Sequence, residues 1–150
     1  MNEDDLLPLT QDTPPEVRAQ LVAGNVARSA GTLLERVGIV VEDVSYEQAV
    51  ASMPVEGNTQ PFGLFHGGAH VVIAESLASL HSYFLSARPV VGVDLNATHV
   101  RATKEGRVHA TATVNHHGRR VINHEVRMTD DDGRLLSIVR ITNMVLSGRS

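Results

Sequence analysis

The stretch His66–Ser86, with the sequence HGGAHVVIAESLASLHSYFLS, decides the fold of this chain. From Ala69 onwards, apolar residues lie on nearly every side of a helical wheel. They are Val71, Val72, Ile73, Ala74, Leu77, Ala78, Leu80, Tyr83, Phe84 and Leu85. A helix that is apolar almost all round is buried by other elements. The sequence therefore predicts a central buried helix over residues 69–86.

After this helix, four segments alternate apolar and polar residues with the period of two that is typical of strands. The segments are 91–99, 108–114, 122–128 and 135–146. Turn-forming residues separate them at 104–106, 117–119 and 130–133. Because tight turns join antiparallel neighbours, the pattern predicts an antiparallel sheet.

The residues before the central helix predict one helical region and one strand. Thr13-Pro14-Pro15 is typical of a helix start with Thr13 as the cap, and Gly31 or Gly38 is expected to end the region. Residues 39–55 are rich in strand-forming residues. A sheet with one long helix packed on it is an α+β fold, which is the predicted class.

The length and composition of the chain are typical of a globular protein. It has 150 residues, of which 42% are apolar and 20% charged, so we expect one domain over residues 14–150. The polar and acidic residues 1–13 are expected to form a flexible tail. Because only 3% of residues are aromatic, the core must be built from Val, Ala, Leu and Ile.

Charge and residue usage exclude several function classes. A net charge of -4 argues against nucleic-acid binding, and the absence of Cys excludes disulfides, thiolate metal sites and a cysteine nucleophile. The longest apolar stretch, 71–85, is interrupted by Glu75 and His81 and is too short and polar to span a bilayer. No targeting segment precedes it, so we expect a cytoplasmic protein with no membrane partner.

Glu75 lies in the middle of the most apolar helix. Burial of an unpaired carboxylate is costly, so a carboxylate kept there is a candidate general base or nucleophile. Ser79 lies one turn further on and Ser82 about two turns on, which gives the helix one polar stripe. The alternative is that this stripe is simply the exposed face of the helix.

His66-Gly67-Gly68 stands where the helix begins, and two glycines are poor helix formers there. A helix start carries free N–H groups and a positive dipole end, which can hold a developing oxyanion. Glu75 is about 12 Å from Gly67 along the helix axis. Either the two serve different sites, or a second chain completes one site.

The eight histidines raise the possibility of a metal site, with His66 and His70 four residues apart and His116, His117 and His124 further on. The glycines between the first two place His66 before the helix, and no HExxH pattern or Cys accompanies them. We therefore expect no metal and no cofactor.

Four separated stretches resemble the hotdog-fold acyl-CoA thioesterases. They are QPFGLFHGGA (60–69), AES (74–76), VGVDLNATHVR (91–101) and EGRV (105–108). The resemblance covers residues 39–146 and is greatest to the branch of the Arthrobacter-type 4-hydroxybenzoyl-CoA and the 1,4-dihydroxy-2-naphthoyl-CoA thioesterases. It implies an antiparallel sheet wrapped round a central helix, and a homodimer with shared active sites that often pairs into a tetramer.

The resemblance also implies roles for five residues. Glu75 is the nucleophile or general base, and the backbone N–H of Gly67 polarises the thioester carbonyl. Gln60 helps to hold the thioester or the water, His66 orients the loop or contacts the carbonyl region, and Ser79 is a hydroxyl beside the carboxylate.

The implied substrate is an aroyl-CoA, with small or medium acyl-CoA as the alternative. The residues expected to bind it are Phe65, Gly68, Ser76, Leu80, His99, Arg101, Lys104, Gly118 and Arg119. Two other functions stay open: a hotdog dehydratase or hydratase, and a non-catalytic acyl-CoA-binding domain.

Overall fold

The computed structural model describes residues 7–147, and these form three helices and six strands. The elements are α1 (Pro15–Arg28), α2 (Leu33–Val37), β1 (Val40–Val44), β2 (Gln48–Pro54), α3 (Gly67–Ser86), β3 (Val90–His99), β4 (Arg107–His117), β5 (Val121–Thr129) and β6 (Leu135–Val145). The predicted central helix and the four strands after it are confirmed, with α3 beginning two residues earlier than expected.

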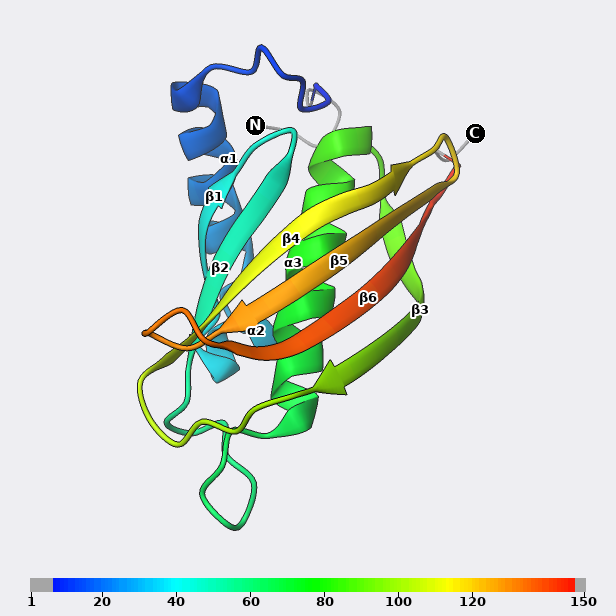
Figure 1. Cartoon of the computed structure of the whole chain (residues 1–150). Coiled ribbons are helices and arrows are strands. Elements are labelled where there is room, and N and C mark those ends of the chain that lie inside the picture. Colours follow the sequence, from blue (N-terminus) through cyan, green and yellow to red (C-terminus); the bar gives the residue numbers. More distant parts are fainter. Residues whose placement is uncertain (1–6, 148–150) are drawn as a thin grey trace.

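The six strands form one antiparallel sheet in the order β1-β2-β4-β5-β6-β3. The sheet curves round α3, which crosses its concave side, as Figure 1 shows. The predicted α+β architecture is therefore confirmed. One local expectation is wrong: the turn at 104–106 does not join neighbours, because β3 pairs with β6 at the far edge and residues 100–106 carry the chain across to β4.

The core lies between α3 and the sheet, and small residues bring the two together. Ala49 pairs with Ala112, and Ala51 with Ala110, across the contact between β2 and β4. All four are fully buried. Because alanine adds little height to the sheet surface, α3 can lie close to it without large aromatic residues. The predicted Val, Ala, Leu and Ile core is observed, with Phe84 as a buried aromatic addition.

The region before α3 differs from the prediction in two ways. The single helical region is two helices, because the chain turns at residues 29–32, where Gly31 takes a left-handed conformation (φ 74°). Gly38, also left-handed (φ 73°), ends α2. Thr13 is not the cap of α1; Pro14 holds that position without a side-chain hydrogen bond. The Thr13 hydroxyl oxygen instead accepts the N–H of Thr10.

The expected strand over 39–55 is a hairpin of two strands, β1 and β2. Its turn is held by Ser45, whose hydroxyl oxygen accepts the N–H of Gln48 at 3.1 Å. Residues 1–6 of the expected tail lie outside the described residues. Within the rest of that tail, Leu9 is buried and its N–H donates to the Phe84 carbonyl at 2.8 Å, so this segment packs on the end of α3.

β3 is an edge strand with one hydrogen-bonding side left unpaired by the described chain. It exposes Val91 and Val93. Among the described residues, no helix is long and apolar enough to cross a membrane.

Candidate active site

The start of α3 is built by three consecutive residues. His66 caps the helix, and its Nδ1 accepts the N–H of Gly68 at 2.8 Å. The Gly67 N–H has no partner within residues 7–147. The two glycines are needed here because a Cβ on Gly67 would lie 2.9 Å from His99 Nε2, and one on Gly68 would lie 3.0 Å from His66 Nδ1. The helix therefore presents a free backbone donor beside an imidazole ring.

Three aromatic rings cluster at this end of α3, with His99 beside the Gly67 donor. His70 stacks on His99 with ring centroids 5.2 Å apart, and Phe65 and His70 are T-shaped with centroids 4.7 Å apart. His99 Nδ1 is 2.8 Å from the hydroxyl oxygen of Ser137, which holds the ring. Burial, followed by the nearby His99, lowers the pKa of His70 to about 4, so His70 is neutral at pH 7.

His70 and Ser137 are site residues that the sequence analysis did not assign. His70 was considered only as a metal ligand, although its position four residues after His66 places it on the same helix face. The described residues contain no group of three His, Asp or Glu side chains that could hold a metal ion.

Glu75 is exposed in the isolated chain, which agrees with the alternative that the polar stripe begins on the exposed face of the helix. It lines a pocket of about 270 Å³ between α3 and β3, together with Gly92, Val93, Asp94, Leu95 and Ile141. Gly92 makes room for it, because a Cβ there would lie 2.7 Å from Glu75 Oε1. The carboxylate thus faces the open edge of the sheet.

The polar stripe beyond Glu75 is tied to the sheet by one buried amide. The Ser79 hydroxyl donates to Asn143 Oδ1 at 2.9 Å, and Asn143 Nδ2 donates to Ser82 Oγ at 3.2 Å. Asn143 and Ser82 are fully buried. Ser76 and Leu80, on the same helix, are half-buried.

The single chain does not bring the proposed catalytic groups together. Glu75 and Gly67 are separated by eight residues of α3, about 12 Å along the axis. Gln60 lies in the loop before α3, where its Oε1 accepts the N–H of Phe62. Its side chain is therefore engaged within its own turn.

The candidate CoA-binding cations lie in two groups at opposite ends of α3. Arg119 and Arg120 lie in the β4–β5 turn and line a pocket of about 190 Å³ with Arg88, which follows α3. Gly118 closes that turn, with its N–H donating to the Val121 carbonyl at 2.9 Å.

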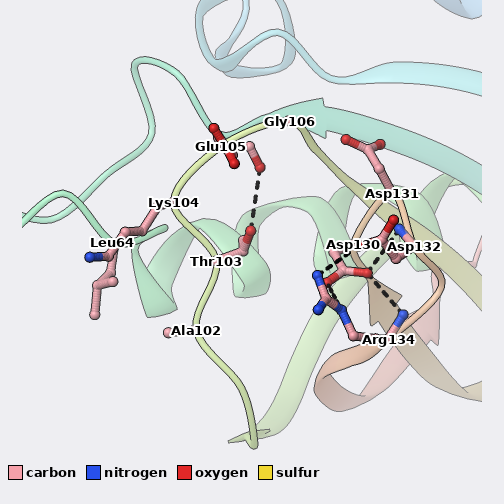
Figure 2. A pocket seen from close by; sticks show the side chains of 10 residues that line it. All are labelled: Leu64, Ala102, Thr103, Lys104, Glu105, Gly106, Asp130, Asp131, Asp132 and Arg134. Carbon is pink, nitrogen blue, oxygen red and sulfur yellow. Dashed lines mark hydrogen bonds and ion pairs between the residues drawn. The ribbon is translucent and has the colours of Figure 1, made fainter.

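The second group follows β3, near the start of α3. Arg101 is exposed, and Lys104 lines a pocket of about 680 Å³ with Leu64, Ala102, Thr103, Glu105, Gly106, Asp130, Asp131, Asp132 and Arg134. Figure 2 shows that Lys104 lies across this pocket from the three aspartates. Arg134 is paired with Asp130 and Asp132, both at 2.8 Å. Lys104 is therefore the cation of this pocket that is not held by its carboxylates.

Three comparisons relate the sequence and the fold of this chain to known proteins. Residues 62–137 match the family model described as "Thioesterase superfamily". The chain is 42% identical to a Deinococcus radiodurans protein named "Putative esterase", over 98% of this chain and 97% of that protein. It is 38% identical to the 1,4-dihydroxy-2-naphthoyl-CoA hydrolase of Escherichia coli, over 80% and 90%. A mutant of thioesterase PA1618 from Pseudomonas aeruginosa has a TM-score of 0.81 and 38% identity, covering 92% of this chain and 98% of that one.

Proposed function

Because this chain belongs to the thioesterase superfamily and has its hotdog fold, we propose that it hydrolyses an aroyl-CoA to the free acid and CoA. Thioester hydrolysis is the activity of the family. Our proposal adds to this activity the aroyl substrate and the roles of individual residues. The observation that carries the residue roles is a pair of groups on α3 without a partner among the described residues, the Gly67 N–H and the Glu75 carboxylate.

The two groups suit the two demands of thioester hydrolysis. The Gly67 N–H, at the positive end of the helix dipole, stabilises the negative charge that develops on the carbonyl oxygen. Glu75 either attacks the carbonyl carbon or removes a proton from the attacking water. His66 holds the helix start in place through its bond to Gly68. Gln60 is assigned to the thioester or the water, which requires its amide to leave its own turn.

A homodimer resolves the 12 Å separation. We assign the contact to β3, whose unpaired edge and exposed Val91 and Val93 suit a second copy. A two-fold axis level with residue 71, midway between the two groups along α3, would place Glu75 of one copy opposite Gly67 of the other. Two such sites form per dimer, and pairing of dimers into a tetramer is the expected assembly.

The same two-fold axis joins the two groups of cations. The β4–β5 turn, which contains Arg119, lies near the end of α3, and the connection 100–106, which contains Lys104, lies near its start (Figure 1). Antiparallel helices therefore bring Arg119 of one copy and Lys104 of the other to the same end of the dimer. Arg101 and Gly118 accompany them. We assign this combined surface to the phosphates of CoA, with Arg88 and Arg120 as additional cations.

The ring cluster at the helix start favours an aromatic acyl group. The exposed His99 offers its ring next to the Gly67 donor, and the buried Phe65 supports it through His70. Leu80, Ser76 and Gly68 complete the expected acyl site. The naphthoyl-CoA substrate in the name of the Escherichia coli relative is also aromatic.

A panel of CoA thioesters tests this proposal. We expect benzoyl-CoA and larger aroyl-CoA to have a higher kcat/KM than acetyl-CoA or hexanoyl-CoA. Glu75→Gln is expected to lower kcat by about 10³-fold without changing the melting temperature, because it removes a base or nucleophile from an exposed position. Glu56→Gln, at another exposed glutamate, is the matched control and should keep wild-type activity.

Two outcomes would contradict the proposal. Preference for a straight-chain acyl-CoA would replace the aroyl substrate by the small or medium acyl alternative. Near-full activity of Glu75→Gln would remove Glu75 from the mechanism.

A further inference from the structure

Asn143 is a fully buried polar residue near the C-terminal end of β6, an unusual environment for an amide. Its side chain points toward α3 and contacts two hydroxyls of that helix, those of Ser79 and Ser82. A buried amide is retained at such a position when its hydrogen bonds are satisfied and useful. Here one of its partners is a residue of the proposed active site.

Near Glu75, the distance between inward-facing residues of β6 is similar to the length of one turn of α3. Glu75 and Ser79 are one helical turn apart, about 6 Å along the axis. Ile141 and Asn143 are two residues apart on the inward face of β6, about 7 Å. Gly92, which makes room for Glu75, is the residue that pairs with Asn143 across β3 and β6. Asn143 is therefore anchored in the part of the sheet that also positions Glu75.

The direction of the hydrogen bonds determines what Ser79 can do. A serine hydroxyl has one proton to donate and two lone pairs with which to accept. Ser79 donates its proton to Asn143 Oδ1, and the bond from Asn143 Nδ2 to Ser82 holds the amide in this orientation. Ser79 is then unable to donate to the Glu75 carboxylate, and it presents only lone pairs toward the space beside Glu75.

We propose that Asn143 is a positioning residue that fixes Ser79 as a hydrogen-bond acceptor for the attacking water. This inference rests on the proposed hydrolytic function and, of its two alternatives, on Glu75 as the general base. Glu75 takes one proton of the water, Ser79 accepts a hydrogen bond from the other, and the water oxygen bonds to the thioester carbon. When the tetrahedral intermediate collapses, the carbon–sulfur bond breaks and the proton on Glu75 passes to the CoA thiolate. The second water proton stays on the product acid.

A double-mutant cycle tests the coupling of Asn143 to Ser79. Asn143→Leu, which is similar in volume, is expected to lower kcat about tenfold and to change KM less than twofold, because one hydrogen bond in the reacting state is misdirected. Ser79→Ala should lower kcat by a similar factor. The double variant should be no slower than Ser79→Ala alone.

Two further variants separate positioning from stability. Asn143→Asp keeps an acceptor for the Ser79 proton, so its kcat should stay within about threefold of wild type even if its melting temperature falls. Ser82→Ala removes the bond that orients the amide and leaves β6 unaltered, so it reports on the same coupling if Asn143→Leu does not fold. Its kcat should fall about threefold.

Asn123→Leu is the matched control. Asn123 donates to Thr142 Oγ1 at 2.9 Å, a bond of the same kind on the other face of the sheet. Its loss should leave kcat unchanged.

All variants are assayed on the thioester that the wild type hydrolyses fastest, so a preference for a straight-chain substrate affects only the aroyl proposal. Wild-type kcat in folded Asn143→Leu, or losses that add fully to those of Ser79→Ala, would overturn the positioning role alone. A wild-type chain that hydrolyses no thioester would overturn both.

Discussion

The two sides of α3 satisfy their polar groups in different ways. On the sealed side, His81 Nε2 donates to the Ser45 carbonyl at 2.8 Å, and His81 Nδ1 is 2.9 Å from His124 Nε2. Both rings are fully buried and bond only within this chain, and His124 Nδ1 has no partner among the described residues. On the open side, the described residues give no partner to the Gly67 N–H or to the Glu75 carboxylate. The buried rings of the sealed side therefore belong to the fold, whereas the Gly67 N–H and the Glu75 carboxylate of the open side are left for groups from outside the chain.

The largest effect is expected in a subunit complementation experiment, which tests whether the open side of α3 needs a second copy of the chain. Glu75→Ala and Gly67→Val chains should each lose about 10³-fold in kcat, because one lacks the carboxylate and the other clashes with His99. In the mixed dimer, the Gly67→Val chain supplies Glu75 and the Glu75→Ala chain supplies Gly67.

After the two variants are unfolded and refolded together, about a quarter of the wild-type activity should return. Each variant refolded alone is the control. No recovery in a mixture that sedimentation shows to contain dimers would contradict the shared site.

Gly92→Ala tests how strongly kcat depends on the position of Glu75 on the open side. Its Cβ would lie 2.7 Å from Glu75 Oε1, so the flexible end of Glu75 must move. We expect kcat to fall between tenfold and a hundredfold, because a misplaced catalytic group is costly, with little change in melting temperature. Gly24→Ala, where the added Cβ meets nothing within 4 Å, should leave kcat unchanged. An active Gly92→Ala enzyme would mean that the position of Glu75 is not critical.

Acid should lower the free energy of unfolding through the buried histidines of the sealed side. Burial lowers the pKa of His81 to about 4, and burial, followed by the neighbouring His81, lowers that of His124 to about 3. Unfolded histidine titrates near 6.5, so below that pH the unfolded chain binds more protons and stability falls until the folded rings titrate. From pH 7 to pH 5 each ring should reduce the free energy of unfolding by about 2 kcal/mol.

Urea denaturation at several pH values measures this loss. His124→Gln should reduce the pH dependence, and the part that remains includes His70, which is also neutral in the folded chain. His109→Gln is the control, because His109 is exposed and paired with Asp131 at the surface. An unchanged slope in His124→Gln would show that the buried pair is not responsible.

Most of the fold was predictable from regular patterns in the sequence. The apolar periodicity of α3 and the alternation of β4 and β5 are local, and these elements were predicted correctly. The hairpin within 39–55 was missed because its turn, at Ser45, carries no Gly or Pro. The pairing of β3 with β6 was missed because a local pattern does not identify a distant partner.

The site was predictable only in part for the same reason. The motif at the start of α3 identified Gly67 and Glu75 as candidates, but periodicity did not decide whether Glu75 is buried. Asn143 was not assigned because an isolated polar residue in a strand is usually read as outward-facing. Its role depends on the hydroxyls that α3 places opposite it.

The strand order has a consequence for how the molecule assembles. β4, β5 and β6 follow one another and can fold as a local meander, but β3 pairs with β6 alone, from Val90 with Val145 to His99 with Ser137. Such non-local pairing is slow because a long loop must close first. During synthesis, β3 therefore leaves the ribosome before its partner exists. The edge of the sheet beside Glu75 requires β6, the last strand along the chain, so a chain whose synthesis has not reached β6 lacks this edge.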